Sequence, residues 1–173
     1  MENNIKYLKS SFNDEIAYCH DDIGSDISIF FFGGYSSDMT GTKATALSKW
    51  CFKNKYNFTR FDYSGHGQSS GEFEDGGITK WSDEANEIFQ NFKNKKNIII
   101  GSSMGGWISL IVAKRNIETI HGLVGIASAP DFVVGEWNRL SEDQKTKIRK
   151  DGKIIINWDD YEDDYVITYK FLE

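Results

Sequence analysis

The sequence predicts an α/β fold, a three-layer sandwich with a mostly parallel sheet that opens with an antiparallel hairpin. Strand-sized apolar runs alternate with segments of helical periodicity, which is the pattern of strands joined by crossover helices. Residues 28–32 form a near-continuous apolar run, typical of a strand buried on both faces of a parallel sheet. Glycine-rich turns follow this run and the run at 97–100, so backbone N–H groups should gather at one edge of the sheet.

The chain before residue 130 supplies the elements of this sheet. Strands at residues 5–10 and 15–20 form the hairpin, which turns around Asn13 and Asp14, a pair that favours tight turns. The helix at 78–93 carries apolar residues at helical spacing and should pack on the sheet. The other expected elements are strands at 28–32, 57–62, 97–100 and 121–127 and helices at 42–55 and 107–113.

After Pro130 the sequence changes to amphipathic helices and short polar segments. The expected elements are helices at 131–140 and 141–151, a strand at 153–158, an acidic loop at 159–164 and a short terminal helix at 166–173. Ser141 is a favourable N-cap for the second of these helices. We expect residues 131–164 to form a lid within a single domain that comprises residues 1–173.

The composition excludes several classes of protein. Hydrophobic residues make up 39% of the chain, as in a globular protein, and no apolar run approaches the roughly twenty residues of a membrane span. The net charge of −6 and the lack of a basic block argue against a nucleic-acid partner. Cys19 and Cys51 show no metal-ligand spacing and should be free thiols in a reducing compartment. The polar start lacks a secretory signal, so we expect a cytoplasmic location; the oligomeric state stays open.

The stretch from Gly101 to Gly106 is the feature around which the chain is organised. It follows an apolar strand, precedes an apolar helix and has the spacing G-x-S-x-G, which is the pattern of a nucleophile elbow centred on Ser103. Glycines two positions away leave room for a serine with sparsely allowed dihedral angles. The N–H of Met104 would lie at the positive end of the helix, where it can hold an oxyanion. The alternative is a glycine-rich turn without chemistry.

A second glycine turn, Gly33-Gly34, follows the buried strand at residues 28–32. It places backbone N–H groups at the same edge of the sheet, or it is a turn that needs only glycine dihedral angles. None of the three histidines is an evident base. His66 lies at this edge, but its own turn holds it and no carboxylate is placed to orient it; His20 ends a hairpin strand, and His121 begins a strand at the far edge.

Three linked blocks, residues 33–44, 60–67 and 101–107, together resemble the α/β-hydrolase family. Within it they look like the branch of palmitoyl-protein thioesterases and acyl-glucuronide esterases. The resemblance implies that a serine, histidine and acid triad hydrolyses carboxylic esters or acyl thioesters, with no cofactor and no metal. It also implies that the N–H of Tyr35 partners that of Met104 in the oxyanion hole.

Four residues are candidates for binding the small-molecule ester or thioester: Gly34, Trp107, Phe132 and Trp137. Packing of the lid is the alternative explanation for the last two and for Trp158.

The family order is serine, acid and then histidine, and no histidine follows His121 in this sequence. We therefore expect an incomplete domain, truncated after the lid region, that is weakly active or inactive because its serine lacks a base. The alternative is a hydrolase fold that binds an acyl or aromatic ligand, or a protein partner, without turnover. A third possibility is an unstable chain, because a sheet that stops at its sixth strand exposes an edge.

Overall fold

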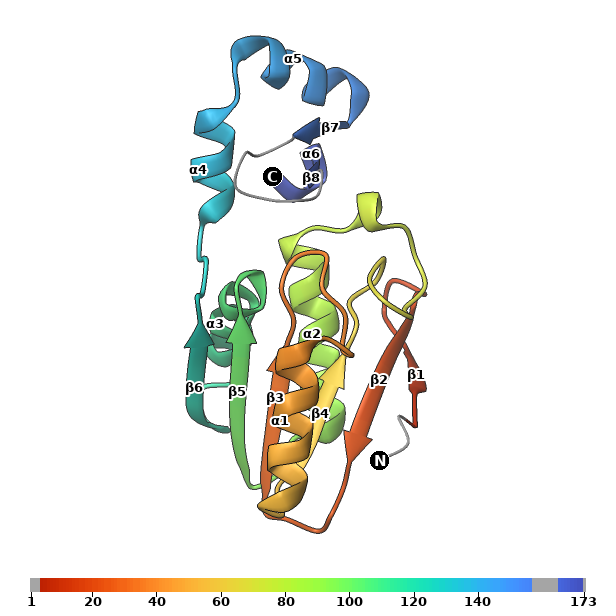
Figure 1. Ribbon diagram of the computed structural model, residues 1–173, viewed down its shortest axis with the longest axis vertical. Helices are drawn as coiled ribbons and strands as arrows, with labels where there is room; N and C mark the ends of the chain where they lie inside the picture. The colour runs from red at the N-terminus through yellow and green to blue at the C-terminus, as the bar shows by residue number, and fades with distance from the viewer. Residues whose placement is uncertain (1–3, 157–164, 173) are drawn as a thin grey trace.

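The computed structural model describes residues 4–156 and 165–172 and contains a six-stranded sheet in the order β1-β2-β4-β3-β5-β6. Its strands are β1 (Lys6–Lys9), β2 (Glu15–Asp21), β3 (Ile27–Phe32), β4 (Asn57–Phe61), β5 (Lys96–Ser102) and β6 (Ile120–Ile126). The first three strands in this order pair antiparallel, and β4, β3, β5 and β6 are parallel and point the same way (Figure 1). This confirms the mostly parallel sheet that opens with a hairpin.

The opening hairpin turns where the sequence predicted. Asn13 has a φ of 68°, and the N–H of Ser10 donates to the carbonyl of Asp14 at 2.8 Å. Asparagine tolerates this left-handed conformation better than most residues, which is why the chain reverses here. The reversal sets the register in which Lys9 faces Glu15.

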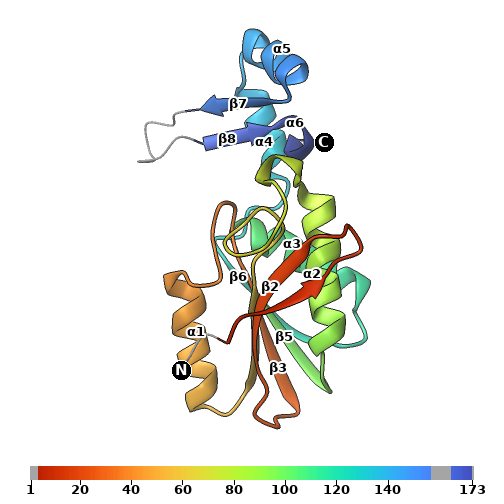
Figure 2. The ribbon, with the colours of Figure 1, turned by 90° about the vertical axis from the view of Figure 1, so that its right-hand side faces the viewer.

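Helices cover both faces of the sheet (Figure 2). One face carries α1 (Thr42–Lys53), and the other carries α2 (Ile78–Phe92) and α3 (Met104–Arg115). Successive side chains of β3 point to opposite faces, so Phe30 and Phe32 enter the core with α2 and α3, whereas Ile29 and Phe31 enter the core with α1. Burial on both faces explains why this strand is apolar throughout.

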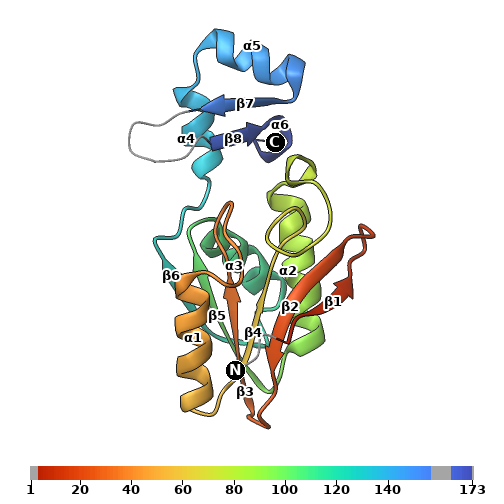
Figure 3. The ribbon, with the colours of Figure 1, turned by 45° about the vertical axis from the view of Figure 1, so that its right-hand side comes forward.

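A cap lies above the carboxyl ends of the parallel strands (Figures 1 and 3). We define it as α4 (Phe132–Arg139), α5 (Glu142–Asp151), β7 (Lys153–Ile156), β8 (Tyr165–Thr168) and α6 (Tyr169–Leu172). It has its own small core, which contains Leu140, Ile148, Ile154 and Ile167. The cap described here thus extends past residue 164, where we expected the lid to end. Both expected helices are present, and Ser141 forms a capping box at the start of α5.

The end of the chain corrects one expectation. We expected a helix at residues 166–173, but residues 165–168 form β8, which pairs antiparallel with β7 and places Ile154 opposite Ile167. The helix is limited to α6. Val166, Ile167 and Thr168 are β-branched, which favours a strand once a partner strand is available. The expected acidic loop at 159–164 and the end of the strand at 153–158 lie outside the described residues.

Among the described residues, the cap contacts the body of the protein through apolar side chains, a hydrogen bond from Tyr35 to Val166, and ion pairs. Phe171 of α6 is only 3% exposed and joins the core beneath it, which contributes about 2 kcal/mol. Lys153 and Lys170 pair with Glu74 and Asp75 of the short 3₁₀ helix η1 (Phe73–Asp75), the second pair at 2.6 Å. These pairs are about half exposed, so each adds little to the attachment. The apolar contact is therefore the main attachment.

Strand β6 lies at one edge of the sheet within the described residues, and β1 lies at the other. Leu123 and Val124 on β6 are 39% and 48% exposed, unlike the side chains of the inner parallel strands. That an exposed edge makes the chain unstable stays a prediction.

Both cysteines are free and buried. Burial raises the pKa of Cys51 to about 12 and also raises the pKa of Cys19, although the Arg60 guanidinium opposes this second shift. The thiolate is the reactive form of a thiol. We expect DTNB to react with native protein at least about a hundredfold more slowly than with unfolded protein.

Colour release by DTNB at pH 8 with and without guanidinium measures this. Ala46→Cys is the matched control, because it adds an exposed thiol to the helix that holds Cys51 and should react quickly in the native state. Rapid reaction of the native wild-type chain would contradict the expectation.

Candidate active site

Ser103 lies in a sharp turn between the last residue of β5 and the first residue of α3. Its φ of 53° and ψ of −120° are rare for a residue with a side chain and cost about 1–3 kcal/mol. Hydrogen bonds hold the turn in place: the N–H of Ser103 donates to Ile126, and its carbonyl accepts from Gly106 and Ala129. Ser103 is exposed at the carboxyl edge of the sheet. The strained conformation and the position at this edge are those that the sequence predicted.

The glycines of the turn are required by close backbone contacts. A Cβ on Gly105 would lie 2.2 Å from the carbonyl oxygen of Phe32 and 2.3 Å from that of Gly33. A Cβ on Gly101 would lie 2.2 Å from the Oγ of Ser109, whose hydroxyl donates to the carbonyl of Gly105 at 2.5 Å. The start of α3 can approach the end of β3 only because these positions lack side chains.

The turn after β3 lies directly beside Ser103. A Cβ on Gly34 would be 3.3 Å from the Cβ of Ser103, so the two glycine-rich turns are in contact. Tyr35 follows in the chain, and Met104 begins the twelve-residue helix α3. The first N–H groups of a helix have no partner within it and carry partial positive charge. That the N–H groups of Tyr35 and Met104 converge on one point about 3 Å from each stays a prediction.

The candidate binding residues have different surroundings. Trp107 lines a cavity of about 780 Å³ between α2, α3 and the cap, together with Val133 and Val134. The Phe132 ring lies 5.4 Å from the ring of Phe171. Trp137 packs within the cap, where its ring is 6.4 Å from that of Tyr169 and 4.9 Å from the guanidinium of Arg149.

Packing therefore accounts for Phe132 and Trp137, the alternative that the sequence left open. Their role in substrate binding stays a prediction. Trp158 lies outside the described residues.

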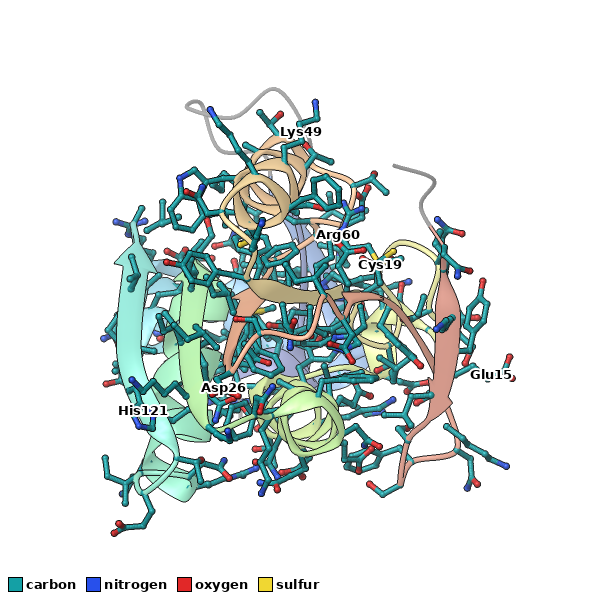
Figure 4. All side chains as sticks on the ribbon, turned by 90° about the horizontal axis from the view of Figure 1, so that it is seen from below. Glu15, Cys19, Asp26, Lys49, Arg60 and His121 are labelled. Atoms are coloured by element: carbon teal, nitrogen blue, oxygen red, sulfur yellow. The ribbon has the colours of Figure 1, made fainter. Side chains whose placement is uncertain are left out.

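Each histidine has partners other than Ser103. His66 is buried among the rings of Phe73 and Trp81, and its Nδ1 lies 3.2 Å from the carbonyl oxygen of Ser64. His20 pairs with Thr59 through Nδ1 at 2.8 Å, and the Nδ1 of His121 lies 3.0 Å from a carbonyl beside it. Figure 4 shows His121 at the outer edge of the sheet, viewed from the end opposite the cap. Within the described part of the chain no hydrogen bond joins a histidine to Ser103.

Two buried carboxylates hold the loop that contains His66. Asp62 accepts from the N–H groups of Met39 at 2.6 Å and Gln68 at 2.9 Å. Glu84 of α2 is fully buried and accepts from the N–H of Ser64 at 2.9 Å. Burial raises the pKa of both carboxyl groups.

Our sequence analysis missed Glu84, although a signal was available. It is a charged residue that lies between Trp81, Ala85 and Ile88 on the apolar face of its helix. A carboxylate at such a position requires a buried partner, which is the N–H of Ser64.

Comparison with known proteins places the chain among hydrolases. The family described as serine aminopeptidase, S33, matches residues 26–158. The rat protein named palmitoyl-protein thioesterase ABHD10, mitochondrial, is 34% identical over 154 residues, which cover 87% of this chain and 51% of the rat protein. The chain spans about half the length of the curated relatives it matches.

Solved structures show the same fold. A putative hydrolase from Agrobacterium vitis S4 has a TM-score of 0.88 and 31% identity, and covers 97% of this chain and 70% of its own. The mouse α/β hydrolase domain-containing protein 10 has a TM-score of 0.85 and 30% identity over 98% of this chain and 68% of its own. These similarities extend over both the sheet and the cap.

The sequence also predicted a cytoplasmic location and no nucleic-acid partner. No helix among the described residues is long and apolar enough to cross a membrane. The cytoplasmic location stays a prediction, and the mitochondrial names of the mammalian relatives do not support it. The absence of a nucleic-acid partner also stays a prediction.

Gly105→Ala should destabilise the protein by on the order of 3 kcal/mol or more, because the added methyl group would overlap two backbone carbonyls of the β3 turn. Gly135→Ala is the matched control. Gly135 lies inside α4 with nothing within 4 Å of its Cβ position, so alanine should add about 0.5–1 kcal/mol of stability there. Urea unfolding followed by circular dichroism measures both. Equal effects of the two substitutions would show that the turn tolerates a side chain.

Burial of His66 should make the stability of the protein depend on pH. Burial lowers the pKa of His66 below its ordinary value of 6.5, so the unfolded chain takes up a proton before the folded chain does. This contribution to stability is complete above about pH 6.5 and is lost as the pH falls toward the folded pKa. His66→Phe keeps a ring but does not titrate, and should flatten the decline of unfolding free energy between about pH 7 and pH 5.

Exposed His121→Gln controls for the loss of a histidine, and His20, whose pKa burial also lowers, is unchanged in both variants. Chemical unfolding at a series of pH values gives the slopes. An unchanged slope in His66→Phe would show that His66 does not titrate differently on folding.

Proposed function

The chain belongs to the α/β-hydrolase family, and on that premise we propose that it acts as a serine hydrolase with Ser103 as nucleophile. We propose carboxylic esters and acyl thioesters as the substrate class, with the N–H groups of Tyr35 and Met104 as the oxyanion hole. The observation that carries this proposal is the strained and exposed backbone of Ser103, at the end of a strand and against a glycine turn. Strain of this kind is retained at functional sites.

The proposed reaction has two stages. The Oγ of Ser103 bonds to the carbonyl carbon, the hydroxyl proton passes to water, and the carbonyl electron pair moves to oxygen, where the two N–H groups stabilise it. The pair then returns, the carbon–sulfur or carbon–oxygen bond breaks, and the acyl group stays on Ser103. Water attacks the acyl-enzyme in the same way and releases the acid, and Ser103 regains a proton.

Thioesters are the better substrates for a site in which no described histidine contacts the serine. A thiol has a pKa of about 8.5, so a thiolate leaves without being protonated, whereas an alkoxide requires a general acid. The relatives named palmitoyl-protein thioesterases support the same substrate class. Turnover by this chain should be slow, because a base contributes several powers of ten to such reactions.

The second candidate function is a hydrolase fold that binds an acyl or aromatic ligand, or a protein partner, without turnover. The engagement of all three histidines away from Ser103 favours it. The cavity beside Trp107, about 780 Å³ in volume, is large enough for a small ligand.

A fluorophosphonate probe distinguishes the two functions. Labelling of the wild-type chain on Ser103 should be slow, because the oxyanion donors assist phosphonylation but no described histidine is placed to take the serine proton. Ser102→Ala is the matched control: it removes the neighbouring hydroxyl, which is buried, and labelling should continue. Ser103→Ala should abolish labelling, and His66→Phe should change the rate by less than about threefold because His66 does not contact the serine.

Mass spectrometry of the labelled protein and release of thiol from an acyl thioester are the measurements. Labelling that persists in Ser103→Ala would contradict the assignment of the nucleophile. If the wild-type chain is not labelled but binds a non-hydrolysable alkyl thioether, the second function replaces the first.

A further inference from the structure

We propose that Tyr35 is a positioning residue whose side chain connects the turn after β3 to the cap. Through this connection, the cap keeps the backbone N–H of Tyr35 beside Ser103. This inference rests on the proposed function, because it gives the cap a role in the oxyanion hole. The observation behind it is that one residue contacts the cap through its side chain and follows a glycine that contacts the turn of Ser103.

Toward the cap, Tyr35 makes a polar contact and an apolar contact. Its hydroxyl donates to the carbonyl oxygen of Val166 at 2.5 Å. Val166 pairs with Ile155 in the β7–β8 hairpin, so this bond reaches the cap's own sheet. The Tyr35 ring also lies 4.6 Å from the ring of Phe171, the residue that anchors the cap in the core. Movement of the cap therefore requires both contacts to change.

Toward the body, the Tyr35 ring rests against fixed aromatic residues. It meets the rings of Phe73 and Trp81 edge to face, with centroids 4.9 and 6.1 Å away. Trp81 is fully buried, and its indole N–H donates to the carbonyl of Ser64 at 3.1 Å. The Tyr35 ring is thus packed between these aromatic residues and the cap, which leaves the side chain few alternative rotamers.

The backbone at Tyr35 needs such an anchor. Two glycines precede it, and glycine has wide conformational freedom. Ser36 has a φ of 54°, and the N–H of Ser37 donates to the carbonyl of Gly34 at 3.2 Å, so the chain turns tightly at this point. A change in the Tyr35 side chain would rotate this turn, and with it the direction of the Tyr35 N–H. The contact with the cap selects one conformation from those that the glycines allow.

Tyr35→Phe tests the proposal, because it removes the hydroxyl and keeps the ring and the backbone N–H. Tyr56→Phe is the matched control, since the Tyr56 ring stacks on Trp50 of α1 on the opposite face of the sheet. The measurements are amide hydrogen exchange in the turn and in β8, and the concentration dependence of fluorophosphonate labelling. The latter separates the maximal rate of labelling from the half-saturating concentration.

We expect amides at residues 34–36 and 166–168 to exchange about tenfold faster in Tyr35→Phe than in the wild-type chain, with no change in Tyr56→Phe. The maximal labelling rate should fall about tenfold while the half-saturating concentration stays within about twofold, because a displaced donor acts on the transition state and not on binding. A variant that was only less stable would not show a lower maximal labelling rate together with faster exchange confined to these two segments.

Unchanged exchange in both segments would overturn the proposal, whatever the labelling rate. Faster exchange with an unchanged maximal rate would also overturn it, because the contact would then have no effect on Ser103. If the wild-type chain is not labelled at all, the proposed function fails, and hydrogen exchange alone decides whether Tyr35 joins the turn to the cap.

Discussion

The site depends on the close approach of two backbone segments at the carboxyl edge of the sheet. The carbonyl oxygens of Phe32 and Gly33 lie where a side chain on Gly105 would lie, so the first turn of α3 packs directly against the end of β3. Ser103 has a φ of 53° and a ψ of −120° in the turn beside this contact, and Gly34 lies against the serine. Burial of β3 and β5 on both faces supplies the packing that offsets the strain.

Two buried carboxylates hold the neighbouring loop that contains His66. Asp62 accepts hydrogen bonds from the N–H groups of Met39 and Gln68, and Glu84 accepts from the N–H of buried Ser64. Burial raises the pKa of each carboxyl group, and the hydrogen bonds from backbone N–H groups oppose this shift. Both carboxylates hold the loop that contains His66 in place. The His66 ring therefore packs against Phe73 and Trp81, although this residue follows a strand that ends at the same edge as Ser103.

The cap is a second packing unit with few attachments to the first. Its own core joins α4, α5 and the β7–β8 hairpin. Phe171, Phe132 and Val133 of the cap pack against the main core, and Val166 accepts from the Tyr35 hydroxyl. Exposed ion pairs add little to this attachment. Among the described residues, the apolar contacts of the cap with the main core therefore account for most of this attachment.

The sequence by itself determined the features that depend on local patterns. Apolar runs and helical spacing determined the parallel sheet and its helices, and the glycine spacing around Ser103 determined the strained turn, because glycine is needed wherever backbones touch. The tertiary structure alone decided three other features: the strand β8 in place of a helix, the burial of Glu84, and the reach of Tyr35 to Val166. Each of these depends on a partner distant in the chain, and a short segment has too weak a local preference to reveal that partner.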